Sequence, residues 1–240
     1  MIEINNVSKT YNRSHKAVDR VSLTIRDGEI FGFIGHNGAG KTTTIKMMTG
    51  VNSIDEGTIT LNGVDISKEP LRAKRSFGFV PDSPDMFLRL KGIEYLTFMA
   101  TVYGVSHEVF KSRLSALSER FGMEHHLNDQ LQSYSHGMRQ KIILIGALLH
   151  DPDIFILDEP MTGLDPRASF ALKELMKEKA ASGKTIFFST HVLEVAEKLC
   201  DRIAMINKGK IIFCGELEEL KAQYPNLSLE EIFMEVTRHE

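Results

Sequence analysis

The sequence predicts an α/β fold with a mainly parallel sheet, an antiparallel β part and an inserted α-helical part. Three observations support this prediction. A strand pattern, a glycine-rich loop and a helix pattern follow one another within residues 29–50. Strand and helix patterns alternate again between residues 154 and 199, which is typical of a parallel sheet. A helical apolar periodicity occupies much of the chain between these two regions.

The composition is that of an ordinary folded protein. The chain has 240 residues, of which 42% are hydrophobic and 25% charged, so neither a disordered nor a collagen-like protein is expected. Its formal charge of -3 argues against a nucleic-acid partner. Cys200 and Cys214 form no metal-ligand or redox pattern, which favours the cytosol. Because we find neither a signal-peptide pattern nor an apolar run of about 18 residues, we expect no membrane-spanning segment.

Residues 1–80 are expected to form the first part of a nucleotide-binding core. The segments 2–7, 21–25 and 58–63 alternate apolar and polar residues, as half-buried antiparallel strands do. The segment EIFGFIG is more continuously apolar, and a glycine-rich loop connects it to the helix pattern KTTTIKMM. This region therefore predicts a strand, a loop and a helix in that order.

Residues 81–149 are expected to form the inserted helical part. The pattern is helical from about Pro81 to Leu131. One apolar face recurs at spacings of four, three and four residues, at Phe110, Leu114, Leu117 and Phe121.

Residues 150–215 are expected to complete the core. The short apolar run at 154–157 is typical of a strand that is buried on both faces. Asp165 and Pro166 predict a helix start, as N-cap and first helical residue, and Gly183 predicts its end. Its expected buried residues are Ala168, Ala171, Leu172, Leu175 and Met176.

A second strand and helix follow, with the strand at 185–190. The expected apolar face of this helix consists of Val192, Val195, Ala196 and Leu199. Lys208 and Gly209 predict a hairpin turn between two further strands. Residues 216–240 are expected to be a short helical extension, in which Ser228 and Glu231 form a capping box. Its final helix has an apolar face of Leu229, Ile232, Phe233 and Val236.

The clearest motif is GHNGAGKTT at residues 35–43, which matches the phosphate-binding pattern G-x-x-x-x-G-K-[ST]. Glycines let the backbone curl so that several N–H groups converge on phosphate oxygens, and the following helix contributes the positive end of its dipole. Lys41 would reach the β and γ phosphates, and Thr42 would bind Mg²⁺. A chance match is expected in roughly one per cent of chains of this length. The expected nucleotide-binding residues here are Gly35, His36, Asn37, Gly38, Ala39, Gly40, Lys41, Thr42 and Thr43.

Acidic residues follow the buried strand at 154–157. Asp158 and Glu159 stand at its carboxyl end, where open α/β sheets place their ligands. Asp158 is the candidate Mg²⁺ ligand, and Glu159 is the candidate general base that polarises water for attack on the γ-phosphate. An acidic pair before a proline can also merely begin a solvated loop, but the phosphate loop argues against that interpretation. His191 follows the next strand and is expected to contact the γ-phosphate side, although a lone histidine is more often structural.

With these residues in place, the chain resembles the nucleotide-binding subunits of ATP-binding cassette (ABC) transporters over nearly its whole length. Residues 35–43 are similar to the Walker A loop of that family, and 154–159 to Walker B with the catalytic glutamate. YSHGMRQK at 134–141 looks like the signature motif, and TGLDP at 162–166 matches the D-loop, with Asp165 at its centre. His191 matches the switch histidine, and Tyr11 the aromatic residue that stacks on adenine, although a strand tyrosine can simply be a packing residue.

The resemblance implies a P-loop NTPase core and an ATPase that acts as a dimer. In the family, the signature segment contacts the ATP held by the opposite subunit, so Ser135, His136, Gly137 and Met138 are the expected residues for that contact. Ser135 can also cap a helix whose N-terminus would bind an anion. The resemblance assigns catalysis to Glu159, His191 and Lys41, and the cofactors ATP and Mg²⁺.

Two positions depart from the family pattern. The family's LSGGQ appears here as YSHGM, so Ser135 and Gly137 remain while His136 and Met138 replace a glycine and a glutamine. Asp82 stands where the family often has the Q-loop glutamine, and its carboxylate is a further candidate Mg²⁺ ligand. An acidic residue here and an ending like SLEEIFMEVT are both familiar among exporters, which favours export.

Two functions of different classes fit these motifs. The first is an ATPase subunit that powers a separate membrane permease, on the inner face of the cell membrane. The permease would dock near residues 82–95, where Met86, Phe87 and Leu88 either form an apolar contact surface or pack within the helical part. The second is a soluble cassette ATPase that serves as an assembly or scaffold factor. The two functions differ in the partner, which is a multi-spanning membrane protein in the first and a soluble protein in the second.

Overall fold

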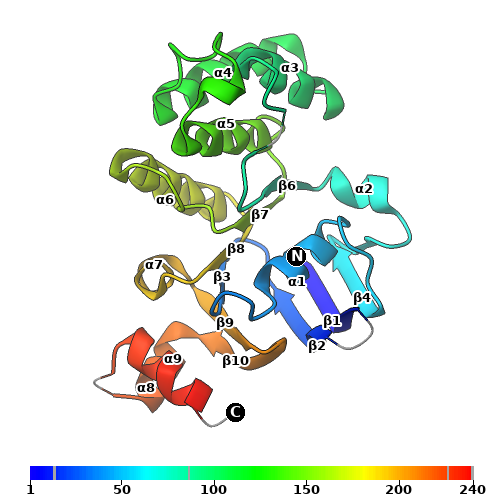
Figure 1. Ribbon diagram of the computed structural model, residues 1–240, viewed down its shortest axis with the longest axis vertical. Coiled ribbons are helices and arrows are strands. Elements are labelled where there is room, and N and C mark those ends of the chain that lie inside the picture. The colour runs from blue at the N-terminus through cyan, green and yellow to red at the C-terminus, as the bar shows by residue number, and fades with distance from the viewer. Residues whose placement is uncertain (13–14, 86, 226, 239–240) are drawn as a thin grey trace.

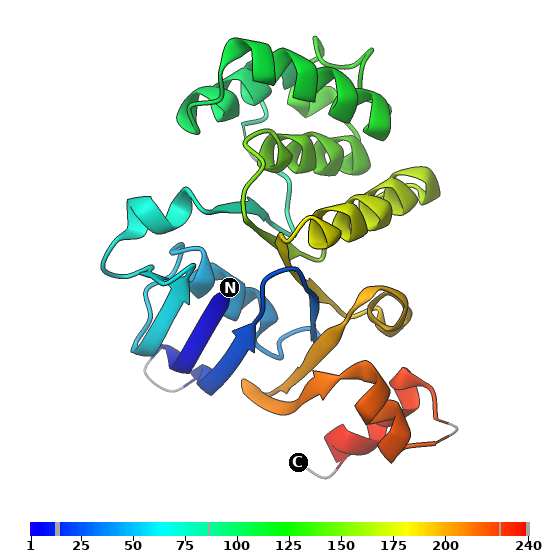
Figure 2. The same cartoon turned by 180° about the vertical axis from the view of Figure 1, so that it is seen from behind.

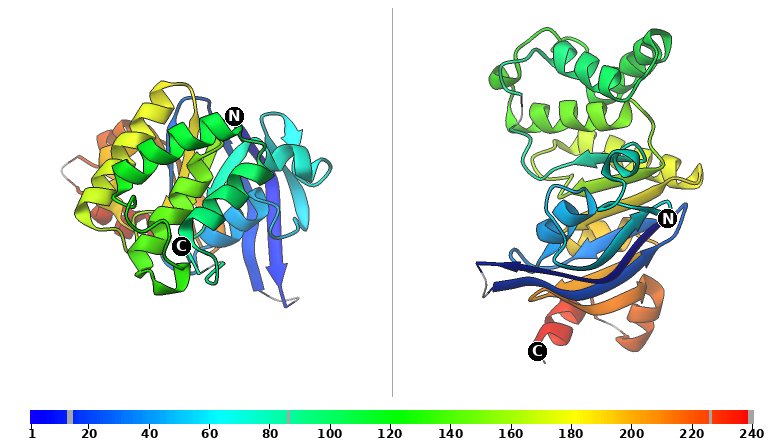
Figure 3. Two further views of the ribbon diagram at one scale, coloured as in Figure 1. Left: turned by 90° about the horizontal axis from the view of Figure 1, so that it is seen from above. Right: turned by 90° about the vertical axis from the view of Figure 1, so that its right-hand side faces the viewer.

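The computed structural model describes residues 1–12, 15–85, 87–225 and 227–238. Figure 1 shows three tiers along its longest axis. The helices of the inserted part lie at one end, two sheets with their helices lie in the middle, and the C-terminal helices lie at the other end. The side view in Figure 3 shows the same separation of the two helical ends.

A six-stranded sheet forms the core in the order β10-β9-β3-β8-β7-β6. All neighbouring strands are parallel except β9 and β10, which form an antiparallel hairpin. Every residue of β3, β7 and β8 is buried, which explains their continuously apolar sequences. The strands are β3 (Ile30–Ile34), β6 (Phe77–Val80), β7 (Ile154–Asp158), β8 (Thr185–Thr190), β9 (Arg202–Asn207) and β10 (Lys210–Glu216).

A four-stranded antiparallel sheet lies beside this core, in the order β2-β1-β4-β5. Its strands are β1 (Ile2–Tyr11), β2 (His15–Ile25), β4 (Glu56–Leu61) and β5 (Val64–Asp65). The alternating sequence of β1 and β4 places Ile2, Ile4 and Ile59 in the core, as the prediction of half-buried strands requires. The predicted fold class, with its parallel and antiparallel parts, is therefore confirmed.

The helices follow the order of the predicted patterns, except that α2 was not predicted. Residues 81–85 and 87–91 were predicted to begin the helical region, but they form no helix. Pro81 and Pro84 lack the N–H donor that a helix interior needs. Phe87 adopts a φ of 55°, which a helix cannot accommodate. Residues 122–130 were also part of the predicted helical region, but they form no helix because Gly122 ends α4 in the left-handed conformation. The helices are α1 (Lys41–Met48), α2 (Pro70–Lys74), α3 (Gly92–Val102), α4 (His107–Phe121), α5 (His136–Leu148), α6 (Pro166–Ala181), α7 (Leu193–Leu199), α8 (Leu217–Gln223) and α9 (Leu229–Arg238).

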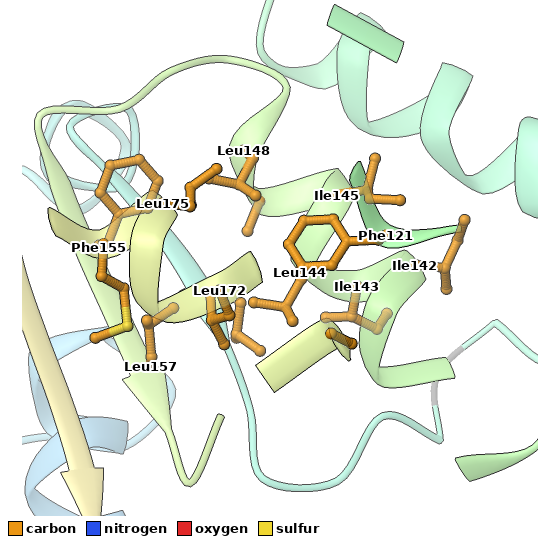
Figure 4. Close-up of a cluster of buried hydrophobic side chains, with 14 of the residues drawn as sticks. Phe121, Ile142, Ile143, Leu144, Ile145, Leu148, Phe155, Leu157, Leu172 and Leu175 are labelled. Atoms are coloured by element: carbon orange, nitrogen blue, oxygen red, sulfur yellow. The ribbon is translucent and has the colours of Figure 1, made fainter. Parts of the chain in front are cut away.

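A continuous apolar cluster joins the inserted helices to the core. Figure 4 shows side chains of α5 next to those of β7 and α6, with Phe121 of α4 among them. Leu144, Leu157 and Leu172 are almost completely buried there. Burial of each such side chain contributes about 1.5–3 kcal/mol, so the inserted helices are anchored to the sheet mainly by apolar packing.

The predicted boundaries of α6 are confirmed by its caps. The Asp165 carboxylate accepts a hydrogen bond of 2.9 Å from the Ala168 N–H, and Pro166 is the first helical residue. Gly183 follows the C-cap with a φ of 88°, a conformation that favours glycine. The predicted face of α7 needs a correction at Val192, which precedes the helix and is 43% exposed, while Ala196 and Leu199 are buried.

The C-terminal part also follows the predicted pattern. Lys208 and Gly209 both have positive φ, as the tight turn between β9 and β10 requires. The Ser228 N–H donates to Glu231 at 2.7 Å, and the Glu231 N–H donates to the Ser228 hydroxyl at 3.2 Å. This capping box begins α9, as predicted. Among the helices of the described ranges, we find none that combines the length and the apolar character needed to cross a membrane.

Candidate active site

The phosphate loop connects the end of β3 to the start of α1. The Ala39 N–H donates to the His36 carbonyl at 3.1 Å, and the Thr44 N–H donates to the Gly40 carbonyl at 3.0 Å. Gly40 has a φ of 114°, and a Cβ at this position would lie 2.6 Å from the Ala17 carbonyl oxygen. Only glycine fits this conformation and this close approach, so the motif's second glycine has a clear structural reason.

The hairpin between β9 and β10 packs against the phosphate loop. The Gly209 N–H donates to the Ala39 carbonyl at 2.9 Å. A Cβ on Gly35 would lie 2.6 Å from the carbonyl oxygen of Ile206 in β9. Gly35 and Ala39 therefore face the protein interior, where they hold the curvature of the loop.

The other residues of the loop line a pocket of about 280 Å³ together with residues from distant parts of the chain. The pocket contains most of the residues predicted to contact the nucleotide and Mg²⁺. Its lining consists of Tyr11, His15, Ala17, His36, Asn37, Gly38, Gly40, Lys41, Thr42, Thr43, Asp82 and Glu159.

The three residues predicted to be catalytic lie in a row. Lys41 Nζ donates to the Gly35 carbonyl at 2.5 Å and lies 3.4 Å from Glu159 Oε1. The other oxygen of Glu159, Oε2, lies 2.9 Å from His191 Nδ1. Lys41 is only 5% exposed, so its charge lies in a region of weak screening. The arrangement can hold negative phosphate next to a carboxylate whose orientation His191 controls.

Ser189 of β8 orders the two neighbouring acids. Its hydroxyl donates to Asp158 Oδ1 at 2.5 Å and accepts the Glu159 N–H at 3.0 Å. Glu159 has a φ of 48°, so the chain turns sharply after β7 and the two carboxylates diverge. Asp158 thus stays beneath the pocket while Glu159 faces into it.

Asp158 has the electrostatics of a cation ligand. Burial raises the pKa of its carboxyl group, the hydrogen bonds from Ser189 and Thr42 oppose that shift, and the charges of Asp82 and Glu159 raise the pKa further. A cation at this point would offset the cost of burying the negative charge of Asp158 and its repulsion by Asp82 and Glu159. Carboxylate and hydroxyl oxygens are ligands that Mg²⁺ accepts, so Thr42, Asp82 and Asp158 form a suitable donor set.

Tyr11 lies at the rim of the pocket. Its ring is 36% exposed, and its hydroxyl accepts a hydrogen bond of 2.6 Å from the Asn52 side chain. Antiparallel pairing places His15 of β2 opposite Tyr11, and both side chains line the pocket. The exposed ring is therefore available to stack on a flat ligand.

Substitution of Tyr11 tests this stacking. We expect Tyr11→Phe to bind ATP nearly as the parent does, because the aromatic face remains. Tyr11→Ala should weaken binding about 5- to 10-fold, since an aromatic stacking contact contributes roughly 1 kcal/mol or slightly more. Fluorescence titration with a labelled ATP analogue measures the change. Equal affinities in all three proteins would remove the stacking role.

The signature segment lies on a different surface. Ser135 is the N-cap of α5, and its hydroxyl accepts the Met138 N–H at 3.2 Å. A Cβ on Gly137 would lie 2.5 Å from the Gly163 carbonyl oxygen, so the signature and the D-loop pack closely. Among the residues that the structure describes, none of the signature segment lines the pocket. Its exposed helix N-terminus is open to an anion from outside the chain.

The two departures in the signature have structural consequences. The exposed His136 ring lies against Gly163, and a Cβ added to Gly163 would lie only 2.3 Å from that ring. Met138 packs against the apolar cluster of α5 and α6. Ion pairs join the same helix to two other segments. Arg139 pairs with Asp85, which lies three residues after Asp82 in the segment between β6 and α3.

Asp165 makes the second ion pair and joins the D-loop to the signature helix. Its carboxylate lies 2.6 Å from Lys141 Nζ. The Lys141 contact, and next the Ala168 N–H, hold the pKa of Asp165 below its usual value. Asp165 remains charged at neutral pH, so the D-loop and α5 stay linked.

Some residues of the site were not found from the sequence. Ser189 stands two residues before His191 at the carboxyl end of β8, and this position in the sequence could have indicated it. His15 and Ala17 had no such signal, because they reach the pocket through the antiparallel sheet. Asn52 had none either, because it acts only through its hydrogen bond to Tyr11.

Comparisons with known proteins show the family of the chain. Residues 18–162 match the family model described as ABC transporter. The chain is 40% identical to the ABC transporter ATP-binding protein NatA of Bacillus subtilis (strain 168), over 91% of this chain and 89% of that protein. It is 36% identical to Nod factor export ATP-binding protein I of Cupriavidus metallidurans, over 92% of this chain and 72% of that protein.

Solved structures show the same likeness. An ATP-binding subunit of an ABC transporter superposes with a TM-score of 0.94 at 34% identity, covering 99% of both chains. A dimeric ATP-binding cassette in a post-hydrolysis state with ADP and phosphate superposes with a TM-score of 0.82 at 24% identity, over 90% of this chain and 99% of that one, which supports the fold. The sequence, the pocket and these comparisons together identify the chain as a member of the ABC transporter family, an ATP-binding subunit with ATPase activity.

Proposed function

We propose that this chain hydrolyses ATP in the described pocket, as one half of a dimer that drives a separate export permease. The contact row Lys41, Glu159 and His191 carries the proposal, since it places a buried cation and a carboxylate in the pocket and an imidazole in contact with that carboxylate. Asp158 and Thr42 lie beside this row.

Each residue has a distinct role in this reaction. Lys41 and the loop N–H groups bind the phosphates, while Glu159 accepts a proton from the attacking water. His191 holds Glu159 in position through its 2.9 Å contact. Thr42, Asp82 and Asp158 would hold Mg²⁺, which neutralises charge on the phosphate oxygens when bound.

Dimerisation completes the site in this proposal. The exposed N-terminus of α5, with Ser135 as its cap, would contact ATP held by a second cassette chain, of the same or another sequence. The dimeric cassette with which the chain shares its fold supports this arrangement. The ion pairs of Arg139 and Lys141 would keep that surface aligned with the core.

Export is supported by the relative named for Nod factor export. It also agrees with the acidic Asp82 and with the sequence of the C-terminal helix. We infer that the chain is a peripheral subunit on the inner face of the cell membrane, because it must contact both cytoplasmic ATP and a permease.

An apolar docking surface, defined by Phe87, Leu88, Phe98 and Val102, supports the permease partner. Phe87 and Phe98 are each 47% exposed, with ring centroids 5.7 Å apart. Phe87 also packs against the ring of Tyr95 in α3, so it contacts the helical part and still leaves an exposed face, as Leu88 does. Met86 lies outside the described residues. The sequence did not indicate Phe98, which contacts Phe87, or the exposed Val102 one turn further along α3. Exposed apolar side chains grouped in this way mark partner sites.

Pull-down of a tagged protein from detergent-solubilised membranes tests the permease partner. We expect the Glu159→Gln variant with ATP and Mg²⁺ to recover a multi-spanning membrane protein. Adding Phe87→Ser and Phe98→Ser should lower recovery about 10-fold or more, because losing two aromatic side chains that the interface would bury costs about 1.4 kcal/mol or more. The double substitution in the otherwise parental chain should leave its ATPase rate unchanged.

Phe170→Ser on the tagged protein is the matched control, since Phe170 is 66% exposed on α6, outside the docking surface. It should recover the membrane protein in full. Undiminished recovery after the double substitution would move the docking site elsewhere. Recovery of soluble proteins only would favour the assembly-factor function instead.

A further inference from the structure

The C-terminal helix contacts the phosphate loop directly. The Phe233 ring of α9 meets the His36 ring edge to face, with the centroids 4.7 Å apart and the planes at 82°. This geometry is a favoured arrangement for two aromatic rings. His36 is the second residue of the phosphate loop, and Phe233 is 2% exposed. The contact joins two segments that are almost two hundred residues apart in the chain.

The His36 backbone controls the position of Lys41. Its carbonyl oxygen accepts the Ala39 N–H at 3.1 Å and lies 3.4 Å from Lys41 Nζ. The loop is rich in glycine, so its backbone has many alternative conformations when no side chain restrains it. A fixed His36 ring restricts the backbone of its own residue and therefore the direction of that carbonyl.

Apolar packing holds Phe233 itself in place. It belongs to a cluster with Ile34 at the end of β3, Ala196 of α7 and Met205 of β9. Figure 2 shows α8 and α9 beside strands β9 and β10, at the end opposite the inserted helices. The first residues of α9 also border a cavity of about 410 Å³ that includes His191 and Leu193. The same helix thus lies against the phosphate loop and next to the segment that follows the switch histidine.

We propose that Phe233 is a positioning residue for ATP binding, because it holds His36 and so preorganises the phosphate loop. This inference rests on the proposed role of that loop as the ATP site. A loop held in its binding conformation loses less conformational freedom when phosphate binds, so its affinity is higher. Phe233 does not line the pocket; it acts through His36.

Substitution of Phe233 by leucine separates the ring contact from burial. Phe233→Leu keeps an apolar side chain at this buried position but removes the aromatic partner of His36. We expect KM for ATP, and Kd for a fluorescent ATP analogue, to rise about 3- to 10-fold, the range of an aromatic pair. The value of kcat should change less than twofold, because Glu159 and His191 are untouched. Phe170→Leu, the same change at an exposed site on α6, should leave both constants unchanged.

Two further measurements distinguish loss of the ring contact from an indirect effect of the substitution. In the NMR spectrum, the His36 ring protons should shift when Phe233 is replaced, since they lie near its ring current. In a His36→Gln background, Phe233→Leu should have no additional effect on KM, because the ring contact is already lost. Thermal unfolding shows whether each variant is folded, and Met234→Ala, at an exposed neighbour on α9, controls for local changes.

The outcomes distinguish this inference from the function it rests on. An unchanged KM in folded Phe233→Leu would overturn it, as would full additivity of the two substitutions. If Lys41→Ala abolishes ATP binding while Phe233→Leu binds normally, only the positioning role fails. If Lys41→Ala binds ATP normally, the phosphate loop is not the ATP site and the proposed function fails as well.

Discussion

Lys41→Ala is expected to lower kcat/KM for ATP by about three orders of magnitude, roughly 4 kcal/mol of transition-state stabilisation. Lys41 is the buried ammonium group of the pocket, 3.4 Å from Glu159 Oε1 and bonded to the Gly35 carbonyl. These contacts hold it beside the positions expected for the β and γ phosphates. Alanine removes the charge that offsets phosphate, so both ATP binding and hydrolysis should fail.

Phosphate release and titration with a fluorescent ATP analogue measure the two effects. Lys46→Ala is the matched control, because Lys46 is on the same helix and exposed to solvent. It should retain both binding and activity. A purified Lys41→Ala protein with full activity would refute the assignment of the phosphate loop.

Glu159→Gln is expected to reduce kcat by a factor of about 10² to 10³ while ATP affinity is maintained. Glutamine has nearly the same shape as glutamate, but its amide cannot accept the proton of the attacking water. It also removes a negative charge close to Asp158 and to the expected γ-phosphate. A protein that binds ATP but hydrolyses it slowly should accumulate as a closed dimer.

Size-exclusion chromatography with ATP and Mg²⁺ detects this dimer, and single-turnover phosphate release measures the chemical step. Glu124→Gln makes the same change at an exposed position in the inserted part. It should hydrolyse ATP at the parental rate and elute as the parent does. Normal turnover by Glu159→Gln would mean that another group is the general base.

Much of the fold followed from local patterns. Short, mainly apolar runs predicted β3, β7 and β8, because strands buried on both faces are mostly apolar. Caps predicted the start of α6 and α9, since their side chains bond the backbone only three residues away. Residues 81–85 and 87–91 were mispredicted because the helical pattern was extended back to Pro81, whereas prolines and a positive φ at Phe87 interrupt the backbone.

Local chemistry within the sequence was sufficient to predict the phosphate loop, the acidic pair and the order of strands and helices around them. The tertiary structure alone decided which distant groups meet: Ser189 between Asp158 and Glu159, Lys141 with Asp165, and Phe233 against His36. The residues of a motif interact with backbone groups only a few positions away, so their spacing can be recognised in the sequence. The distant contacts depend on strand order and helix packing, which bring together side chains whose spacing along the chain has no periodicity.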